Sequence, residues 1–97
     1  MNHCVYILFS KKANSYYIGE TSDLANRLHW HNTGEFKKSY TKIANDWEIF
    51  FVINCKNSIQ ARKIEKHVKK MKSKVYIENL LLYPEIINKL LEKYKDC

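Results

Sequence analysis

The amino-terminal fifth of the chain holds two strand-like segments joined by a short polar connection. Residues 5–9 form a continuous apolar run, and residues 16–18 return to apolar and aromatic character before Gly19. The stretch between them, residues 10–15, is polar and turn-prone. Strands separated by so few residues pair antiparallel, because the chain has no room for a crossover. The sequence therefore predicts a β-hairpin at the start of the fold.

Each predicted strand carries a tyrosine, Tyr6 in the first and Tyr17 in the second. Side chains alternate between the two faces of a strand, so the pairing register decides whether these tyrosines share a face. If the numbers of paired residues sum to an odd value, the two hydroxyls converge on one side and Tyr16 lies on the other. Tyrosine is a common strand residue and the chain has seven. The pair alone therefore indicates no function.

The middle of the chain carries signals for a helix, a loop and a third strand. Residues 21–23, Thr-Ser-Asp, supply helix-capping side chains, which predicts a helix running to about Asn32. The polar residues 35–46 are expected to form a loop. The apolar and aromatic residues 47–53 are expected to form the third strand.

The second half is predicted to contain three helices. Asn57 opens a capping-box pattern with Gln60, Ser73 is expected to cap a helix through Leu82, and Pro84 fits the first turn of the last helix. The residues expected to face inward are Ala61, Ile64, Val68 and Met71, followed by Ile86, Ile87, Leu90, Leu91 and Tyr94. The predicted order is β-β-α-β-α-α-α, a small three-stranded antiparallel sheet packed with helices in the α+β class.

Chain length predicts one domain over residues 1–97, with a core over about 3–75 and C-terminal helices over 76–95. No apolar run approaches the roughly 18 residues of a membrane span, and the start lacks the basic segment of a secretory signal. We therefore expect a cytoplasmic protein without membrane contact.

The three cysteines are Cys4, Cys55 and Cys97. Their odd number and scattered spacing indicate neither a disulfide framework nor a zinc site.

The chain is basic, with 17 Lys and Arg against 10 Asp and Glu, a net charge of +7. A small domain with this excess has an electrostatic reason to bind polyanions, although basic charge also serves solubility alone. The lysines that we consider as candidates for nucleic-acid binding are Lys37, Lys38, Lys42, Lys66, Lys69 and Lys70.

Three charged or titratable residues stand at the edges of predicted apolar helix faces. Arg27 and His31 share a face with two leucines. Arginine can hold a phosphate through two parallel hydrogen bonds, and histidine can move a proton near neutral pH. Glu65 borders the stripe of the helix that follows Asn57, where a carboxylate needs a partner. The ordinary alternatives are snorkelling side chains on the first helix and an i,i+4 ion pair between Glu65 and Lys69.

Taken in order, these residues resemble the GIY-YIG nuclease superfamily. The resemblance rests on Val5-Tyr6, Tyr17-Ile18-Gly19, Arg27, His31-Asn32 and Glu65 within Ala61-Arg62-Lys63-Ile64-Glu65-Lys66. It spans about residues 3–75 and is strongest to the small single-domain bacterial (UPF0213-like) branch. Each piece is weak by itself, whereas the full set in this order is specific.

The resemblance implies an endonuclease that hydrolyses phosphodiester bonds of nucleic acid, with DNA as the expected partner, assisted by one divalent cation, Mg²⁺ or Mn²⁺. Glu65 matches the metal ligand of the family, and Tyr17 matches the tyrosine that helps to deprotonate water. Tyr6 matches its hydrogen-bonding partner, and Arg27 the group that holds the phosphate. His31 matches a proton-relay position, and Tyr40 is a candidate for a further tyrosine of the site.

Two residues depart from the family pattern. Cys4 replaces the first glycine, and Glu20 follows Gly19 where a related repair nuclease has lysine. Both departures favour the alternative that the chain is a non-catalytic nucleic-acid-binding module on the same fold. The joint retention of Tyr6, Tyr17, Arg27 and Glu65 argues against such decay. A protein-interaction domain with an incidental basic surface is the third alternative.

Overall fold

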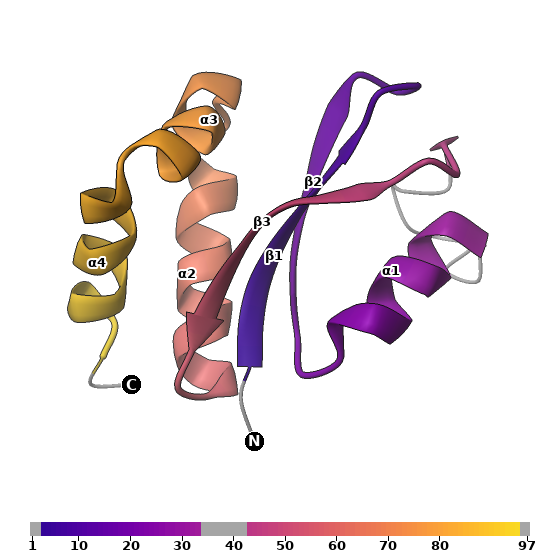
Figure 1. The fold of residues 1–97 in the computed structure, drawn as a ribbon. Coiled ribbons are helices and arrows are strands. Elements are labelled where there is room, and N and C mark those ends of the chain that lie inside the picture. The colour runs from indigo at the N-terminus through magenta and orange to yellow at the C-terminus, as the bar shows by residue number, and fades with distance from the viewer. Residues whose placement is uncertain (1–2, 34–42, 96–97) are drawn as a thin grey trace.

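The computed structural model describes residues 3–33 and 43–95. Its sheet has three strands, β1 (His3–Ser10), β2 (Ser15–Thr21) and β3 (Glu48–Cys55). The strand order is β2-β1-β3, and both neighbours pair antiparallel with the central β1 (Figure 1). The third strand thus begins one residue later than predicted and continues to Cys55.

The register of the hairpin settles the position of the two tyrosines. Tyr6 pairs with Gly19 and Leu8 pairs with Tyr17, so the paired numbers sum to 25. The sum is odd, and Tyr6 and Tyr17 therefore lie on the same face of the sheet, as the alternation of side chains requires. Tyr16 faces the opposite side, where its ring packs against Phe50.

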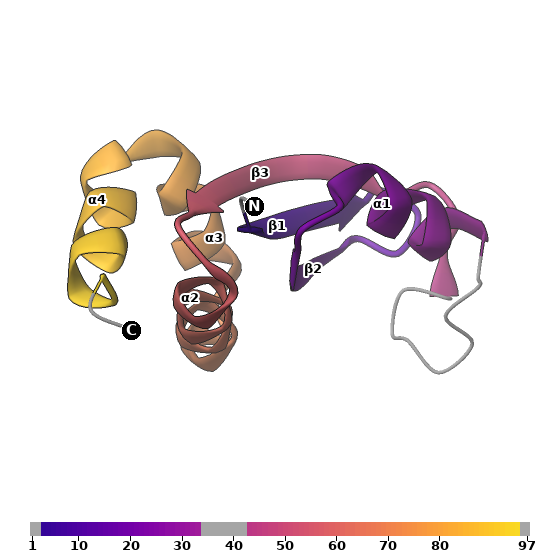
Figure 2. The same cartoon turned by 90° about the horizontal axis from the view of Figure 1, so that it is seen from below.

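Four helices complete the predicted order β-β-α-β-α-α-α: α1 (Leu24–Thr33), α2 (Ser58–Met71), α3 (Lys74–Leu82) and α4 (Pro84–Lys93). Helix α1 stands apart from the group formed by α2, α3 and α4, as Figure 2 shows. The predicted α+β class is confirmed. None of the helices in the described ranges is long and apolar enough to cross a membrane.

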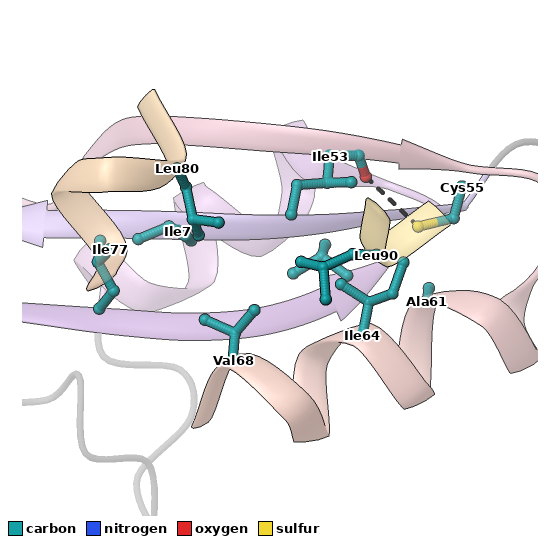
Figure 3. Packing of buried hydrophobic residues seen from close by; sticks show 10 residues of the cluster. Ile7, Ile53, Cys55, Ala61, Ile64, Val68, Ile77, Leu80 and Leu90 are labelled. Carbon is teal, nitrogen blue, oxygen red and sulfur yellow. Dashed lines mark hydrogen bonds between the residues drawn. The ribbon is translucent and has the colours of Figure 1, made fainter. Parts of the chain in front are cut away.

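The larger part of the core lies between the sheet and α2, α3 and α4 (Figure 3). Ala61, Ile64 and Val68 are buried there, as predicted. The prediction that Met71 is buried with them is wrong, because Met71 is 45% exposed. It lies in the last turn of α2, immediately before the left-handed Lys72, and borders a groove toward α4.

The predicted helix caps are present, with one difference in partner. Asn57 Oδ1 accepts a hydrogen bond from Gln60 N at 2.8 Å, and Ser73 Oγ accepts one from Tyr76 N at 3.1 Å. Gln60 does not return to Asn57, since its Oε1 accepts from Lys56 N at 2.8 Å. Its Nε2 donates to Leu91 O at 3.1 Å, which ties α4 to the start of α2.

A smaller core lies on the α1 face of the sheet. Tyr6, Leu8, Ala44 and Trp47 are buried there, with Leu28 of α1 packed against them. This cluster is separate from the larger one, so the tyrosine face has its own packing support. Cys4 and Cys55 are free thiols, and Cys97 lies outside the described residues.

Candidate active site

Three aromatic side chains meet on the α1 face of the sheet. The Tyr6 hydroxyl is hydrogen-bonded to His31 Nε2 at 3.0 Å, and His31 is only 2% exposed. The ring of Tyr17 lies 4.8 Å from that of His31 and 6.3 Å from that of Tyr6, measured between centroids. We call Tyr6, Tyr17 and His31 the aromatic triad. It joins β1, β2 and α1 at one point.

Gly19 is needed because the ring of Tyr6 lies directly over it. A Cβ atom built on Gly19 would stand 2.5 Å from Tyr6 Cζ and closer still to the hydroxyl oxygen. Such an approach is not tolerated by real side chains, and Tyr6 is buried with little freedom to move. The lack of a side chain at Gly19 therefore leaves room for the ring of Tyr6 on the neighbouring strand.

Asn32 holds the end of α1 against the start of β3. Its Oδ1 accepts a hydrogen bond from Trp47 N at 2.7 Å, and its Nδ2 donates to Trp47 O at 2.9 Å. These two hydrogen bonds to the backbone of one residue fix the turn of α1 that carries His31. Asn32 was named beside His31 in the sequence pattern, but its positioning role was not foreseen, since an asparagine near a helix end is expected to serve as an ordinary cap.

The environment keeps both partners of the Tyr6–His31 hydrogen bond neutral. Burial raises the pKa of Tyr6, the nearby Tyr17 raises it further, and Arg27 opposes this through its charge and a hydrogen bond. Burial also lowers the pKa of His31, with the charge of Arg27 acting in the same direction. At neutral pH we therefore expect a phenol and an uncharged imidazole. A neutral imidazole has one nitrogen able to accept a proton.

Arg27 lies close enough to the triad to act on two of its members. It is half-buried on α1, and its guanidinium lies 5.3 Å from the centroid of the Trp30 ring. Its charge acts on Tyr6 and His31, and it also partly opposes the rise that burial causes in the pKa of the Glu65 carboxyl. The positive charge of Arg27 thus acts on Tyr6, His31 and Glu65.

Glu65 approaches the site from α2. Its side chain is 22% exposed, and Lys69 Nζ lies 3.8 Å from Glu65 Oε1. The same Lys69 Nζ lies 5.9 Å from the centroid of the Tyr17 ring, so the lysine extends toward the edge strand β2. Burial raises the pKa of Glu65, Lys69 opposes this, and Glu20 adds to it. The ion pair with Lys69 that the spacing offered as an alternative is therefore present.

Glu20, the departure beside Gly19, contacts residues outside the triad. Its carboxylate contacts His3 Nε2, and Arg62 Nε lies 3.6 Å from its Oε1. The contact with His3 Nε2 is made by Oε2, which is buried. Glu20 thus acts on the candidate site chiefly through its charge on Glu65.

Comparison with known proteins gives this arrangement its context. A family model for the GIY-YIG catalytic domain matches residues 2–79. The chain belongs to the GIY-YIG family. It is accordingly a member of a nuclease family, and the elements that carry the aromatic triad, Arg27 and Glu65 all lie within the matched region.

Two proteins are similar to this chain over most of their length. UPF0213 protein YazA of Bacillus subtilis (strain 168) is 36% identical over 80 residues, which cover 79% of each chain. The solution NMR structure of the UPF0213 protein BH0048 from Bacillus halodurans has a TM-score of 0.51 and 31% identity, covering 84% of this chain and 83% of that one. The resemblance drawn from the sequence is confirmed.

The metal that the GIY-YIG family implies is compatible with the side chains present. Among residues 3–33 and 43–95, no group of three or more His, Cys, Asp or Glu is placed to hold a metal ion. Glu65 offers a single, partly buried carboxylate whose described partner is a weak contact with Lys69. Such a site fits a hard cation that keeps most of its water ligands, as Mg²⁺ does, and does not fit one enclosed by protein ligands.

The candidate lysines divide into two groups. Lys66, Lys69 and Lys70 are exposed along α2, next to Glu65 in sequence. Lys37, Lys38, Lys42 and Tyr40 lie outside the described residues. The positions of these four relative to the triad stay predictions.

Proposed function

We propose that this protein is a divalent-metal-dependent endonuclease that hydrolyses phosphodiester bonds of DNA. The observation that carries the proposal is the hydrogen bond between Tyr6 and His31 beside Tyr17. Arg27 and Glu65 act electrostatically on Tyr6 as well. Membership of a nuclease family supports the reaction class.

In this proposal the aromatic triad orients the attacking water and removes a proton from it. Tyr17 orients the water and helps to deprotonate it as the water oxygen forms a bond to phosphorus. Tyr6 is hydrogen-bonded to His31 Nε2. In the proposed role its hydroxyl is the donor, and Nε2 of the neutral His31 is the proton acceptor. The pKa of Tyr6 is raised by burial, so its phenol keeps a proton to pass on. The water proton passes to the Tyr6 oxygen as Tyr6 gives its own proton to His31. The bond from phosphorus to the leaving sugar oxygen breaks in the same displacement, and that oxygen takes up a proton from solvent.

Arg27 and Glu65 handle the charges of the reaction. Arg27 holds the scissile phosphate through its planar fork and offsets the negative charge that grows in the transition state. Glu65 is the residue that would hold Mg²⁺ or Mn²⁺. When bound, such a cation stabilises negative charge on the phosphate and lowers the pKa of water. Docking of the strand is assigned to Lys66, Lys69 and Lys70, with Lys37, Lys38, Lys42 and Tyr40 as further candidates.

The test is incubation of the protein with labelled single-stranded, duplex and branched DNA, and with RNA, in Mg²⁺, in Mn²⁺ and in EDTA. We expect cleavage of at least one DNA in a divalent metal and none in EDTA. Cleavage that is unaffected by EDTA would contradict the metal requirement. Cleavage of RNA alone would contradict the assignment of DNA. A cytoplasmic location is part of the proposal and is tested by cell fractionation.

The second candidate is a nucleic-acid-binding module without catalysis. One observation favours it, because burial and the charge of Glu20 both raise the pKa of Glu65 and so disfavour the charged form that a cation needs. The two candidates differ in the same experiment. Salt-sensitive binding of DNA or RNA without cleavage in any metal would replace the enzyme by the binding module.

A further inference from the structure

A basic groove runs between α2 and α4, away from the aromatic triad. It encloses about 520 Å³. Four lysines line it, Lys63, Lys66, Lys70 and Lys93, together with His67 and Tyr94. None of the described residues that line it is acidic. We call this feature the α2–α4 groove. Helix α4 begins beyond the residues that the family model matches, so the groove uses a wall outside that region.

The walls of the α2–α4 groove are fixed by polar and aromatic contacts. His67 Nδ1 is hydrogen-bonded to the Tyr94 hydroxyl at 3.0 Å, and their rings lie edge to face with centroids 5.9 Å apart. Elsewhere along the two helices, Gln60 Nε2 donates to Leu91 O at 3.1 Å. The lysines therefore project from a preformed frame, and a ligand need not order the two helices on binding.

The groove continues the basic surface that starts at the candidate active site. Lys69 lies beside both Glu65 and Tyr17. Successive residues of a helix are turned by about 100° around its axis. Lys66 directly follows Glu65, and Lys70 directly follows Lys69, so each lysine is turned by about 100° around α2 from the residue before it. Lys66 and Lys70 both line the groove. Lysine residues thus follow α2 from Glu65 round to the groove, which Lys93 of α4 also lines.

We propose that the α2–α4 groove binds backbone phosphates of the nucleic-acid strand on one side of the cleaved bond. This inference rests on the proposed function for its link to cleavage, although binding itself can be tested separately. Four ammonium groups in one groove call for several negative charges, which successive phosphates of one strand supply. Lysines act as point charges without base recognition, so the contact is expected to be independent of sequence.

Binding of labelled DNA in EDTA tests the groove without any cleavage. The double variant Lys63→Gln with Lys93→Gln removes two charges from the two walls. Its matched control is Lys11→Gln with Lys12→Gln, which removes two exposed charges from the turn between β1 and β2. Fluorescence anisotropy at several salt concentrations gives the dissociation constant and its salt dependence for parent, variant and control.

We expect the groove variant to bind about tenfold or more weakly at low salt. The slope of log affinity against log salt should fall by about 1.4 to 1.8, at about 0.7 to 0.9 for each phosphate that the variant no longer neutralises. The control should stay near the parent. If the groove variant and the control match each other, the groove proposal is overturned. It is equally overturned if the parent binds no nucleic acid.

A second measurement separates a strand from a small anion. Addition of a short oligonucleotide should shift the NMR signals of His67 and Tyr94, whereas inorganic phosphate at the same phosphate concentration should not. Equal shifts by both would overturn the proposal in favour of a small-anion site. If the parent binds through the groove and cleaves nothing, the proposed nuclease activity fails while the groove stands. If the parent cleaves and the groove variant binds normally, only the groove fails.

Discussion

Tyr6 and His31 are hydrogen-bonded at 3.0 Å although 25 positions separate them in the chain. Tyr6 comes from the central strand and His31 from the last turns of α1. The bond depends on three supports: the hairpin register, the absence of a side chain at Gly19, and the attachment of Asn32 to Trp47. The last two supports can each be removed by a single substitution, which makes the geometry of the triad testable.

Gly19→Ala should destabilise the fold through Tyr6 alone. The new Cβ would overlap the Tyr6 ring, and overpacking of this kind costs about 1–3 kcal/mol. In a background that carries Tyr6→Ala the same substitution should cost much less, since the ring is absent. Urea denaturation of the four proteins of this cycle measures the difference. Equal costs in both backgrounds would mean that the glycine serves another purpose.

Asn32→Ala should loosen α1 from β3. Removal of the amide leaves the backbone N–H and carbonyl of Trp47 without the hydrogen bonds that Asn32 supplies, and a loss of about 1–3 kcal/mol is expected. Under the proposed function, cleavage should fall as well, because His31 follows α1. Asn45→Ala, at an exposed position before β3, is the control and should change neither quantity. A stable, fully active Asn32→Ala protein would contradict this positioning role.

The pH dependence of stability should contain a contribution from His31. Its pKa is lowered by burial and by Arg27, so the unfolded chain binds more protons than the folded one near the ordinary pKa of 6.5. The free energy of unfolding then rises with pH through this region, and the contribution is lost as pH falls below about 6.5. Denaturation between pH 5 and 8 should show a flatter rise for His31→Gln than for the parent. An unchanged profile would place the titration elsewhere.

Arg27→Lys should not preserve activity if Arg27 holds the phosphate. Lysine keeps the charge and loses the planar fork, so the phosphate would be held at a single point. A loss of about 10²-fold or more in cleavage rate is expected, by comparison with removal of one charge-stabilising donor. Arg62→Lys is the control, since Arg62 is the other arginine and contacts Glu20. Near-normal cleavage by a folded Arg27→Lys protein would refute the role.

Much of the fold was accessible from the sequence because its elements carry local signals. The hairpin followed from a short polar connection, and the starts of α2 and α3 from capping side chains whose hydrogen bonds are present. Met71 was predicted wrongly, because helical spacing cannot tell where the packing partner of a helix ends. The hairpin by itself left the register that unites Tyr6 and Tyr17 open, since its sequence allows both alternatives.

The candidate site was less accessible because its geometry depends on contacts between distant segments. Composition did not reveal that Gly19 accommodates the ring of Tyr6 or that Asn32 binds a backbone unit 15 positions away. Glu65 was expected at the edge of an apolar stripe, and its partly buried position agrees. Lys69 lies near both Glu65 and Tyr17. This arrangement depends on how α2 packs against the sheet, and no local sequence pattern predicts that packing.

Glu65→Gln tests the central claim most directly, because it separates cleavage from docking. Glutamine keeps the shape of the side chain and removes the charge that a cation needs. The variant should bind DNA at least as tightly as the parent, with the same fall in affinity as salt rises, and should cleave at a rate near zero in Mg²⁺ and Mn²⁺. Glu92→Gln, an exposed site on α4, should cleave like the parent. Cleavage by Glu65→Gln as fast as by the parent would contradict the assignment of Glu65 and the metal-dependent mechanism built on it.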